Sequence, residues 1–291
     1  MTDPDSIRTG HEGAGRGRPV ALLLLPALLL VAAFFAYPIL DLTKASLFDP
    51  DFTTAHFVKF FTQNLYWRVS FNTVETAFVT TLLCAVIGYP AAWFLAHSPQ
   101  KLRPFLIFLI LLPMWVSVLI RSYAWMAVLG REGIINSLLM GTGLISEPFA
   151  MLYTTGAVHL AMVQILLPIM ILTCYGVMRE IEPDLLKAAH VLGAGRFRAF
   201  LHVYLPLSLS GLRNGAVVIF ILSMGYFITP ELVGGRKDMM IGNLIVFQID
   251  KLANWGFASA IGIILLIATI AMVLLLRAGL DRVVPSAGRA E

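Results

Sequence analysis

The chain has 291 residues, of which 58% are hydrophobic and only 13% charged, and its mean hydropathy is +0.83. Soluble domains carry about 25% charged residues, so this composition excludes an ordinary soluble protein and predicts one that lies in a lipid bilayer. The net charge of +4 does not indicate nucleic-acid binding, because the basic residues lie between apolar runs and form no continuous basic face.

The N-terminal segment, residues 1–18, is polar and rich in glycine, so it predicts a disordered tail. The apolar run that follows, from Val20 to Leu40, resembles a signal peptide in its position. It is long enough to cross a bilayer, however, and it lacks a small-residue cleavage site. We therefore interpret it as a retained first transmembrane helix.

Apolar runs of about 20 residues predict six transmembrane helices. The predicted spans cover residues 20–42, 71–96, 105–129, 152–177, 211–230 and 257–277. Pro113 and Pro168 interrupt the third and fourth spans, where a proline is expected to kink a membrane helix without ending it. The sequence thus predicts an all-α, polytopic membrane protein with one transmembrane domain, residues 19–280.

The Lys and Arg residues predict the orientation. Thirteen lie on the side of the N-terminal tail and seven on the opposite side. Because basic residues accumulate on the cytoplasmic side, both termini are expected in the cytoplasm of a bacterium, with the spans in its inner membrane. The link between the fourth and fifth spans, 179–211, and the C-terminal tail, 281–291, are then cytoplasmic as well.

The link at 179–211 carries a predicted helix from Pro183 to Leu192. Pro183 suits a first helical turn, Asp184 suits the positive end of a helix dipole, and Gly193 can end the helix. Four apolar residues at positions i, i+3, i+4 and i+7 form one stripe with a small, flat centre, namely Leu185, Ala188, Ala189 and Leu192. The stripe fits a docking surface for another protein or a helix on the membrane surface, and the residues alone leave both open.

The same link resembles the EAA loop of binding-protein-dependent ABC importer permeases, whose pattern is E-A-A-x3-G-x9-I-x-L-P. The matching residues keep the family spacing throughout and are Lys187, Ala188, Ala189, Gly193, Val203, Leu205 and Pro206. The resemblance implies a type I ABC importer permease fold, with this loop as a coupling helix in a groove of the ATP-binding cassette subunit. Lys187 replaces the Glu of the family pattern and reverses its charge, and Asp184 one turn earlier can compensate.

The resemblance also implies the partners, which are a dimer of ATPase subunits, a second similar permease and a periplasmic solute-binding protein. The sequence contains no G-x-x-x-x-G-K-[ST] loop, so ATP and Mg are expected on the ATPase and no cofactor on this chain. Cys84 and Cys174 lack metal-ligand spacing, and no catalytic set of polar residues lies within the spans. We therefore expect neither a metal site nor an enzyme.

Two further stretches resemble the permeases of spermidine and putrescine importers, LPMWVSVLIRSYAWMAVLG at 112–130 and SMGYFITPELVGG at 223–235. The same subfamily includes permeases for opines and other small cationic or zwitterionic solutes. The resemblance therefore implies a polyamine importer, with those solutes as the alternative. An ion-driven secondary transporter would need acids near mid-membrane and an internal inverted repeat, and we find neither in the sequence.

Carboxylates and aromatic rings near the outer ends of the spans suit the ammonium groups of a polyamine. The candidate pathway residues are Glu75, Tyr123, Trp125, Tyr226, Thr229 and Glu231. The aromatic residues equally suit the belt at the membrane surface, and Glu75 equally suits a structural pair with Arg121.

Two outer segments add to this prediction. Thr229-Pro230 and Gly234-Gly235 predict a break at the outer end of the fifth span, which can expose backbone carbonyls to a solute. The aromatic loop from Phe52 to Trp67 is expected on the outer membrane surface or against the solute-binding protein.

Overall fold

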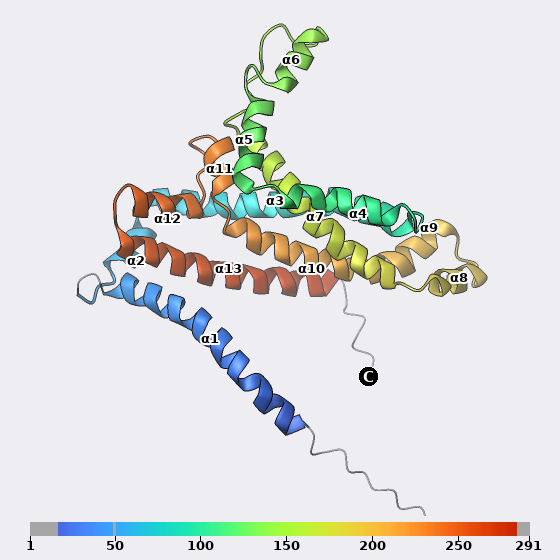
Figure 1. The fold of residues 1–291 in the computed structure, drawn as a ribbon, viewed down its shortest axis with the longest axis horizontal. Helices are drawn as coiled ribbons and strands as arrows, with labels where there is room; N and C mark the ends of the chain where they lie inside the picture. Colours follow the sequence, from blue (N-terminus) through green and yellow to red (C-terminus); the bar gives the residue numbers. More distant parts are fainter. Residues whose placement is uncertain (1–16, 49–50, 284–291) are drawn as a thin grey trace, which may run out of the picture.

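The computed structural model describes residues 17–48 and 51–283, which are built from helices (Figure 1). In chain order the elements are α1 (Gly17–Leu47), α2 (Ala55–Thr62), α3 (Asn64–His97), α4 (Arg103–Leu111), the 3₁₀ turn η1 (Leu112–Trp115), α5 (Val118–Leu129), α6 (Ile134–Gly141), α7 (Thr155–Glu180), α8 (Pro183–Val191), α9 (Arg196–Ala199), the π turn η2 (Phe200–Tyr204), α10 (Leu205–Met224), α11 (Ile228–Val233), α12 (Ile241–Asp250) and α13 (Trp255–Val283). The predicted all-α fold is confirmed. The predicted tails lie outside the described residues, except for residues 17–18 and 281–283, which belong to α1 and α13.

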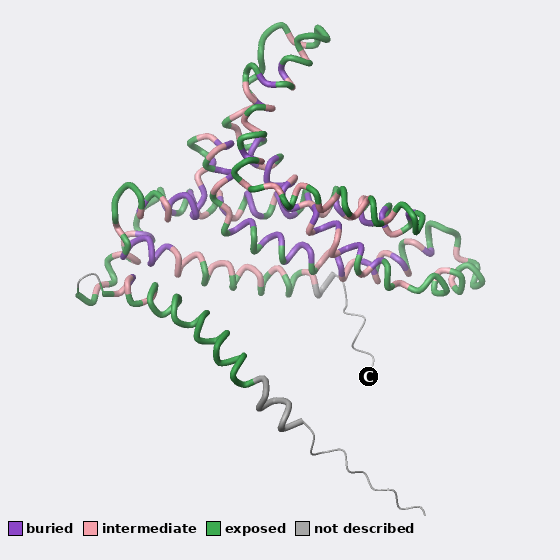
Figure 2. The backbone as a smooth tube through the Cα atoms, in the orientation of Figure 1, coloured by how far each residue is buried: buried purple, intermediate pink, exposed green. Residues whose placement is uncertain are grey.

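The centre of the molecule is α7, which packs against α3 and α10. Half of the residues of α7 are buried (Figure 2), because small and apolar side chains from three helices meet there. Cys84, Met170 and Cys174 are fully buried in this core. Pro168 is buried within an unbroken α7, so the prediction that this proline does not end the fourth span is confirmed.

The third predicted span is not one helix. α4 ends before Pro113, the chain passes through η1, and Val116 is extended before α5 begins. Pro113 has no N–H to donate to the carbonyl four residues earlier, and α4 gives way to the tighter η1 turn at this point. The sharp change of direction follows at the extended Val116, between the two halves. The halves, Arg103–Trp115 and Val118–Gly141, are bent by 93°. The prediction that this proline only kinks the span was wrong.

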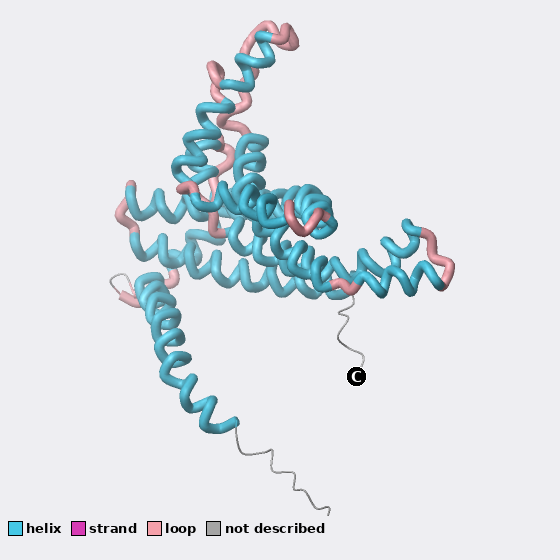
Figure 3. The backbone as a smooth tube through the Cα atoms, turned by 45° about the vertical axis from the view of Figure 1, so that its right-hand side comes forward, coloured by secondary structure: helices cyan, strands magenta, loops and turns pink. Residues whose placement is uncertain are grey.

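The bend sends α5 and α6 away from the bundle as an arm, which projects in both views of the backbone (Figures 1 and 3). Within the described residues, five helices are long and apolar enough to cross a membrane, or six if the bent pair counts as one span. The six predicted apolar segments therefore all exist as helices, although one of them is broken.

The fifth span begins and ends earlier than predicted. Its helix runs from Arg196 to Met224, whereas the sequence predicted residues 211–230. Pro206 lies within this helix and cannot donate to the carbonyl four residues before it. The helix accommodates it with η2, in which the Leu205 N–H donates to the Phe200 carbonyl five residues back.

The bundle has two distinct ends (Figure 1). The end that carries α8 and α9 lies opposite the end that carries α2, α11 and α12. α1 diverges from the bundle while contacting α13, and its large apolar side chains from Leu25 to Leu42 are exposed. Figure 2 colours this part of α1 as exposed. This divergence leaves α1 with an apolar surface that lipid or another membrane protein can cover.

Candidate functional site

The predicted helix in the 179–211 link exists as α8, and a Schellman motif ends it. Gly193 has φ +85°, and its N–H donates to the His190 carbonyl at 3.0 Å. The N–H of Ala194 donates to the Ala189 carbonyl at 3.0 Å, which completes the motif. No atom lies within 4 Å of a Cβ built on Gly193. Glycine is favoured here because of the backbone conformation and not because of space.

The apolar stripe of α8 faces out of the chain. Leu185 and Leu192 are 44% and 87% exposed, and Ala188 between them is exposed too. Ala189 is half-buried, and Leu186, outside the stripe, packs against the core. Leu186 therefore holds α8 to the bundle, while the stripe on another face of α8 is largely exposed among the described residues.

Lys187 forms an ion pair within α8. Its Nζ lies 2.8 Å from Oδ1 of Asp184, and both side chains are largely exposed. An exposed pair of this kind adds little stability, but it satisfies the reversed charge locally. Whether Asp184 replaces the charge of the family's Glu toward an ATPase subunit stays a prediction.

A continuous route connects α8 to the bundle. α8 contacts η2 and α9, and these continue directly into α10. Leu205 and Pro206 lie at the start of α10, immediately after the π turn. The turn at residues 192–195 separates α8 from α9 along the chain. A displacement of α8 therefore reaches α10 through the contacts of α8 with α9 and η2, because α9, η2 and α10 form one helix.

Among the candidate pathway residues, Trp125 and Thr229 meet at the junction of α5, α7 and α11. The indole Nε1 of Trp125 donates to Oε1 of Gln164 at 3.4 Å. The Thr229 hydroxyl lies 3.1 Å from that of Ser122, and Thr229 is fully buried. Thr229 therefore joins α11 to α5, and in this conformation its side chain does not face a solute.

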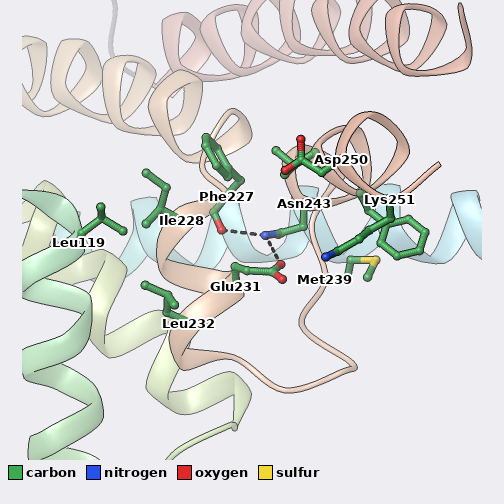
Figure 4. A pocket seen from close by; sticks show the side chains of 11 residues that line it. Leu119, Phe227, Ile228, Glu231, Leu232, Met239, Asn243, Asp250 and Lys251 are labelled. Carbon is green, nitrogen blue, oxygen red and sulfur yellow. Dashed lines mark hydrogen bonds between the residues drawn. The ribbon is translucent and has the colours of Figure 1, made fainter. Parts of the chain in front are cut away.

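Glu231 lies in a cavity of about 300 Å³. Its Oε2 accepts a hydrogen bond of 2.8 Å from Nδ2 of Asn243, which also donates to the Phe227 carbonyl at 2.8 Å (Figure 4). Asp250 and Lys251 line the same cavity. Two carboxylates and one ammonium around a partly apolar cavity can bind a small solute that carries amino groups.

Tyr226, Glu75 and Tyr123 lie apart from this cavity. Tyr226 is half-buried between α10 and α11, within electrostatic range of Arg121. Glu75 is exposed on α3 and acts electrostatically on His159, and no ion pair joins it to Arg121 among the described residues. Tyr123 is exposed on the arm. Of the predicted pathway residues, Glu231 therefore lines this cavity, whereas Tyr226, Glu75 and Tyr123 do not.

The break at the outer end of the fifth span differs from the prediction. α10 ends at Met224, before Gly225, and Pro230 lies inside α11. Gly234 and Gly235 permit a close approach, because a Cβ on Gly235 would lie 2.5 Å from the Tyr153 carbonyl oxygen. The glycine pair therefore packs this turn against the start of α7, with the Phe227 carbonyl already bound by Asn243.

Several polar residues that no sequence pattern predicted hold this end together. Asp238 is 5% exposed and accepts hydrogen bonds from the Thr155 hydroxyl at 2.6 Å and the Gly235 N–H at 2.8 Å. Asn72 on α3 donates to the Met239 carbonyl at 2.9 Å. The available signal was the presence of Asp, Asn and Gln within or beside apolar segments, where unpaired polar groups are costly.

Comparison with known sequences gives one family and several named relatives. The family described as "Binding-protein-dependent transport system inner membrane component" matches residues 85–287. The spermidine/putrescine transport system permease protein PotB of Escherichia coli (strain K12) is 35% identical over 248 residues, which cover 85% of this chain and 88% of that protein. PotB of Haemophilus influenzae is 35% identical over 253 residues, 84% of each chain.

Comparison with solved structures shows the same architecture. A chain of a bacterial alginate ABC transporter, in complex with an alginate-bound periplasmic protein, superposes with a TM-score of 0.74 and 19% identity, covering 93% of this chain and 96% of that one. A chain of the MetNI methionine ABC transporter gives a TM-score of 0.56 and 20% identity, covering 78% and 100%. At these identities the similarity establishes the fold alone.

Proposed function

This chain belongs to the family of binding-protein-dependent transport system inner membrane components, and from this premise we propose that it imports polyamines. It is a multi-pass inner-membrane protein and the permease subunit of an ATP-driven ABC importer. Family membership favours this function over an ion-driven secondary transporter. The proposed partners are an ATPase dimer that binds ATP and Mg, a second permease and a periplasmic solute-binding protein.

The proposed coupling element is α8, on the cytoplasmic side together with both termini. The observation that supports this role is an apolar stripe exposed on a helix that contacts α9 and η2, which form one helix with α10. When the ATPase subunits close, a groove that holds the stripe moves α8, and α9, η2 and α10 move with it. This motion changes which end of the pathway is open.

The proposed solute is a polyamine such as putrescine or spermidine. Two relatives that are 35% identical to this chain are named spermidine/putrescine transport system permease proteins. The cavity beside α12 presents the carboxylates of Glu231 and Asp250. Asn243 fixes Glu231 through the 2.8 Å hydrogen bond, so one acceptor is oriented before a solute arrives. An ammonium group could replace or share this bond.

The direct test is uptake by the complete transporter reconstituted in proteoliposomes with its binding protein. Radiolabelled spermidine and putrescine are expected to accumulate only when ATP is present, and an excess of an opine is expected to compete poorly. Accumulation without ATP, or preferred uptake of the opine, would contradict the proposed function or its solute class, respectively.

Glu231→Gln is expected to raise the KM for spermidine about tenfold with little change in kcat, because it removes a charge-assisted contact on the order of 1.5 kcal/mol. Initial uptake rates over a range of spermidine concentrations measure this effect. Glu132→Gln removes an exposed charge outside the cavity and serves as the matched control. Equal KM values for the two variants would show that Glu231 does not contact the solute.

One observation favours a zwitterionic solute as the second candidate. Lys251 lines the same cavity as Glu231, and its ammonium would suit a solute carboxylate while repelling a polyamine. Lys251→Gln separates the two cases. It should improve or leave unchanged the uptake of spermidine, whereas it should impair the uptake of an amino-acid-like solute.

A further inference from the structure

A second, larger cavity lies on the other side of α12. Its volume is about 770 Å³, and Met239 and Phe247 line both this cavity and the one around Glu231. α2, the start of α3, the turn before α12 and α12 itself enclose it. The two cavities therefore share one wall at the α12 end of the bundle, which is the outer end in the predicted orientation.

The charge of this second cavity is opposite to that of the first. Four cations from three separate segments line it, namely Lys59, Arg68, Arg236 and Lys237, and the described lining residues include no carboxylate. Four like charges around one cavity repel one another unless an anion binds between them. They would also repel a polyamine, so the proposed transport pathway does not use this cavity.

The oxygen of a buried amide in the same wall has no partner among the described residues. Gln248 is 4% exposed and lines the cavity, and its Oε1 has no hydrogen-bond partner among the described residues. The two ends of an amide can exchange by a flip, so Gln248 can present its NH2 group to an acceptor. A buried polar group left unpaired costs free energy, and the flipped amide would add a hydrogen-bond donor to the four cations of this wall.

The remaining lining indicates an amphiphile. Apart from the cations and two amides, the wall is apolar or aromatic, and Leu65 and Leu252 are exposed at the cavity. Beside it, Trp67 is exposed and donates its Nε1 proton to the Phe61 carbonyl at 3.0 Å. Exposed Trp and Phe at the end of a membrane helix are typical of the membrane–water interface, where lipid headgroups lie.

We propose that this basic cavity binds the phosphodiester headgroup of an anionic phospholipid from the outer leaflet, with acyl chains along Leu65 and Leu252. Lys59 is already positioned, because its Nζ lies 4.4 Å from the centre of the Phe257 ring. Arg236 and Lys237 belong to the turn that Asp238 and Asn72 hold in place. A bound lipid therefore links α2 and α3 to the turn before α12.

The test uses the complete transporter in phosphatidylcholine nanodiscs, titrated with phosphatidylglycerol and monitored by native mass spectrometry. Wild-type protein is expected to retain phosphatidylglycerol selectively. Arg236→Gln/Lys237→Gln should bind it about 30-fold more weakly, the effect of losing two cation–phosphate contacts. Lys44→Gln/Arg131→Gln removes one Lys and one Arg that are exposed outside the cavity, and it should bind as the wild type does.

Gln248→Met keeps the size of the side chain and removes its hydrogen-bonding groups, so it should weaken lipid retention without changing the net charge. The proposal is overturned if wild-type protein shows no preference for phosphatidylglycerol, or if both double variants lose it equally. It is also overturned if millimolar inorganic phosphate displaces the lipid, which indicates a free-anion site. Unchanged lipid retention with weakened capture by the solute-binding protein would identify the surface as a protein contact instead.

Discussion

Replacing Leu192 with Glu is expected to reduce ATP-dependent uptake on the order of a hundredfold while the chain still inserts and folds. Leu192 is 87% exposed at the end of the α8 stripe, so the substitution removes no packing inside this chain. In the proposed complex the same side chain lies in an apolar groove of the ATPase, where a buried, unpaired carboxylate costs several kcal/mol. Uptake assays and copurification of the ATPase subunit measure the effect.

Val191 provides a matched control for this prediction. It is 88% exposed and directly precedes Leu192, but it lies off the stripe, since successive residues of a helix point about 100° apart. Val191→Glu is expected to change uptake only a few-fold. If the two variants lost uptake equally, the stripe would not be the docking face, and if neither lost it, α8 would not couple the ATPase to transport.

Removing the carboxylate of Asp238 is expected to lower the free energy of unfolding by about 3 kcal/mol. Asp238 is almost fully buried, and its two oxygens accept hydrogen bonds from Thr155 and Gly235. In Asp238→Ala both donors lose their acceptor, and the turn before α12 loses its hydrogen bond to Thr155 of α7. The midpoint of thermal unfolding in detergent should fall by several degrees.

Two other substitutions make this result specific. Asp238→Asn keeps one acceptor oxygen and should lie between wild type and the alanine variant. Asp250→Ala removes an exposed carboxylate close by in the chain and should leave the midpoint within about a degree, because exposed charges contribute little. Equal midpoints for Asp238→Ala and Asp250→Ala would show that the buried carboxylate does not hold the turn.

Local signals in the sequence predicted that the apolar helices and α8 exist, although the third span is broken and the fifth begins and ends earlier than predicted. Apolar length decides whether a segment spans a bilayer, and this property belongs to each segment by itself. α8 was predictable for a similar reason, because Pro183 and Gly193 act on the backbone within one turn of their own positions. Pro113 predicts an interruption of the third span. Only the structure shows that this interruption is a 93° break between Trp115 and Val118.

The pathway residues were predicted less well, because a pathway is formed by contacts between distant segments. Thr229 lies near a helix break, and this position predicted that it lines the pathway. The structure instead buries it against Ser122, 107 residues earlier. The sequence did not predict Asn243 as a pathway residue, although Asn243 orients Glu231 by a hydrogen bond. A residue's distance from a span end does not reveal which side of the helix it occupies.

The sequence by itself determined the solvent in which this protein folds, the number of apolar segments and the one exposed helix with a recognisable pattern. Only the tertiary structure decided the 93° bend, the two oppositely charged cavities beside α12 and the hydrogen bonds that join Asn72 to Met239 and Thr73 to Ile241. The physical reason is the distance along the sequence over which each interaction acts. Burial in lipid and helix formation depend on residues within a few turns, whereas these last two bonds join residues 167 and 168 positions apart.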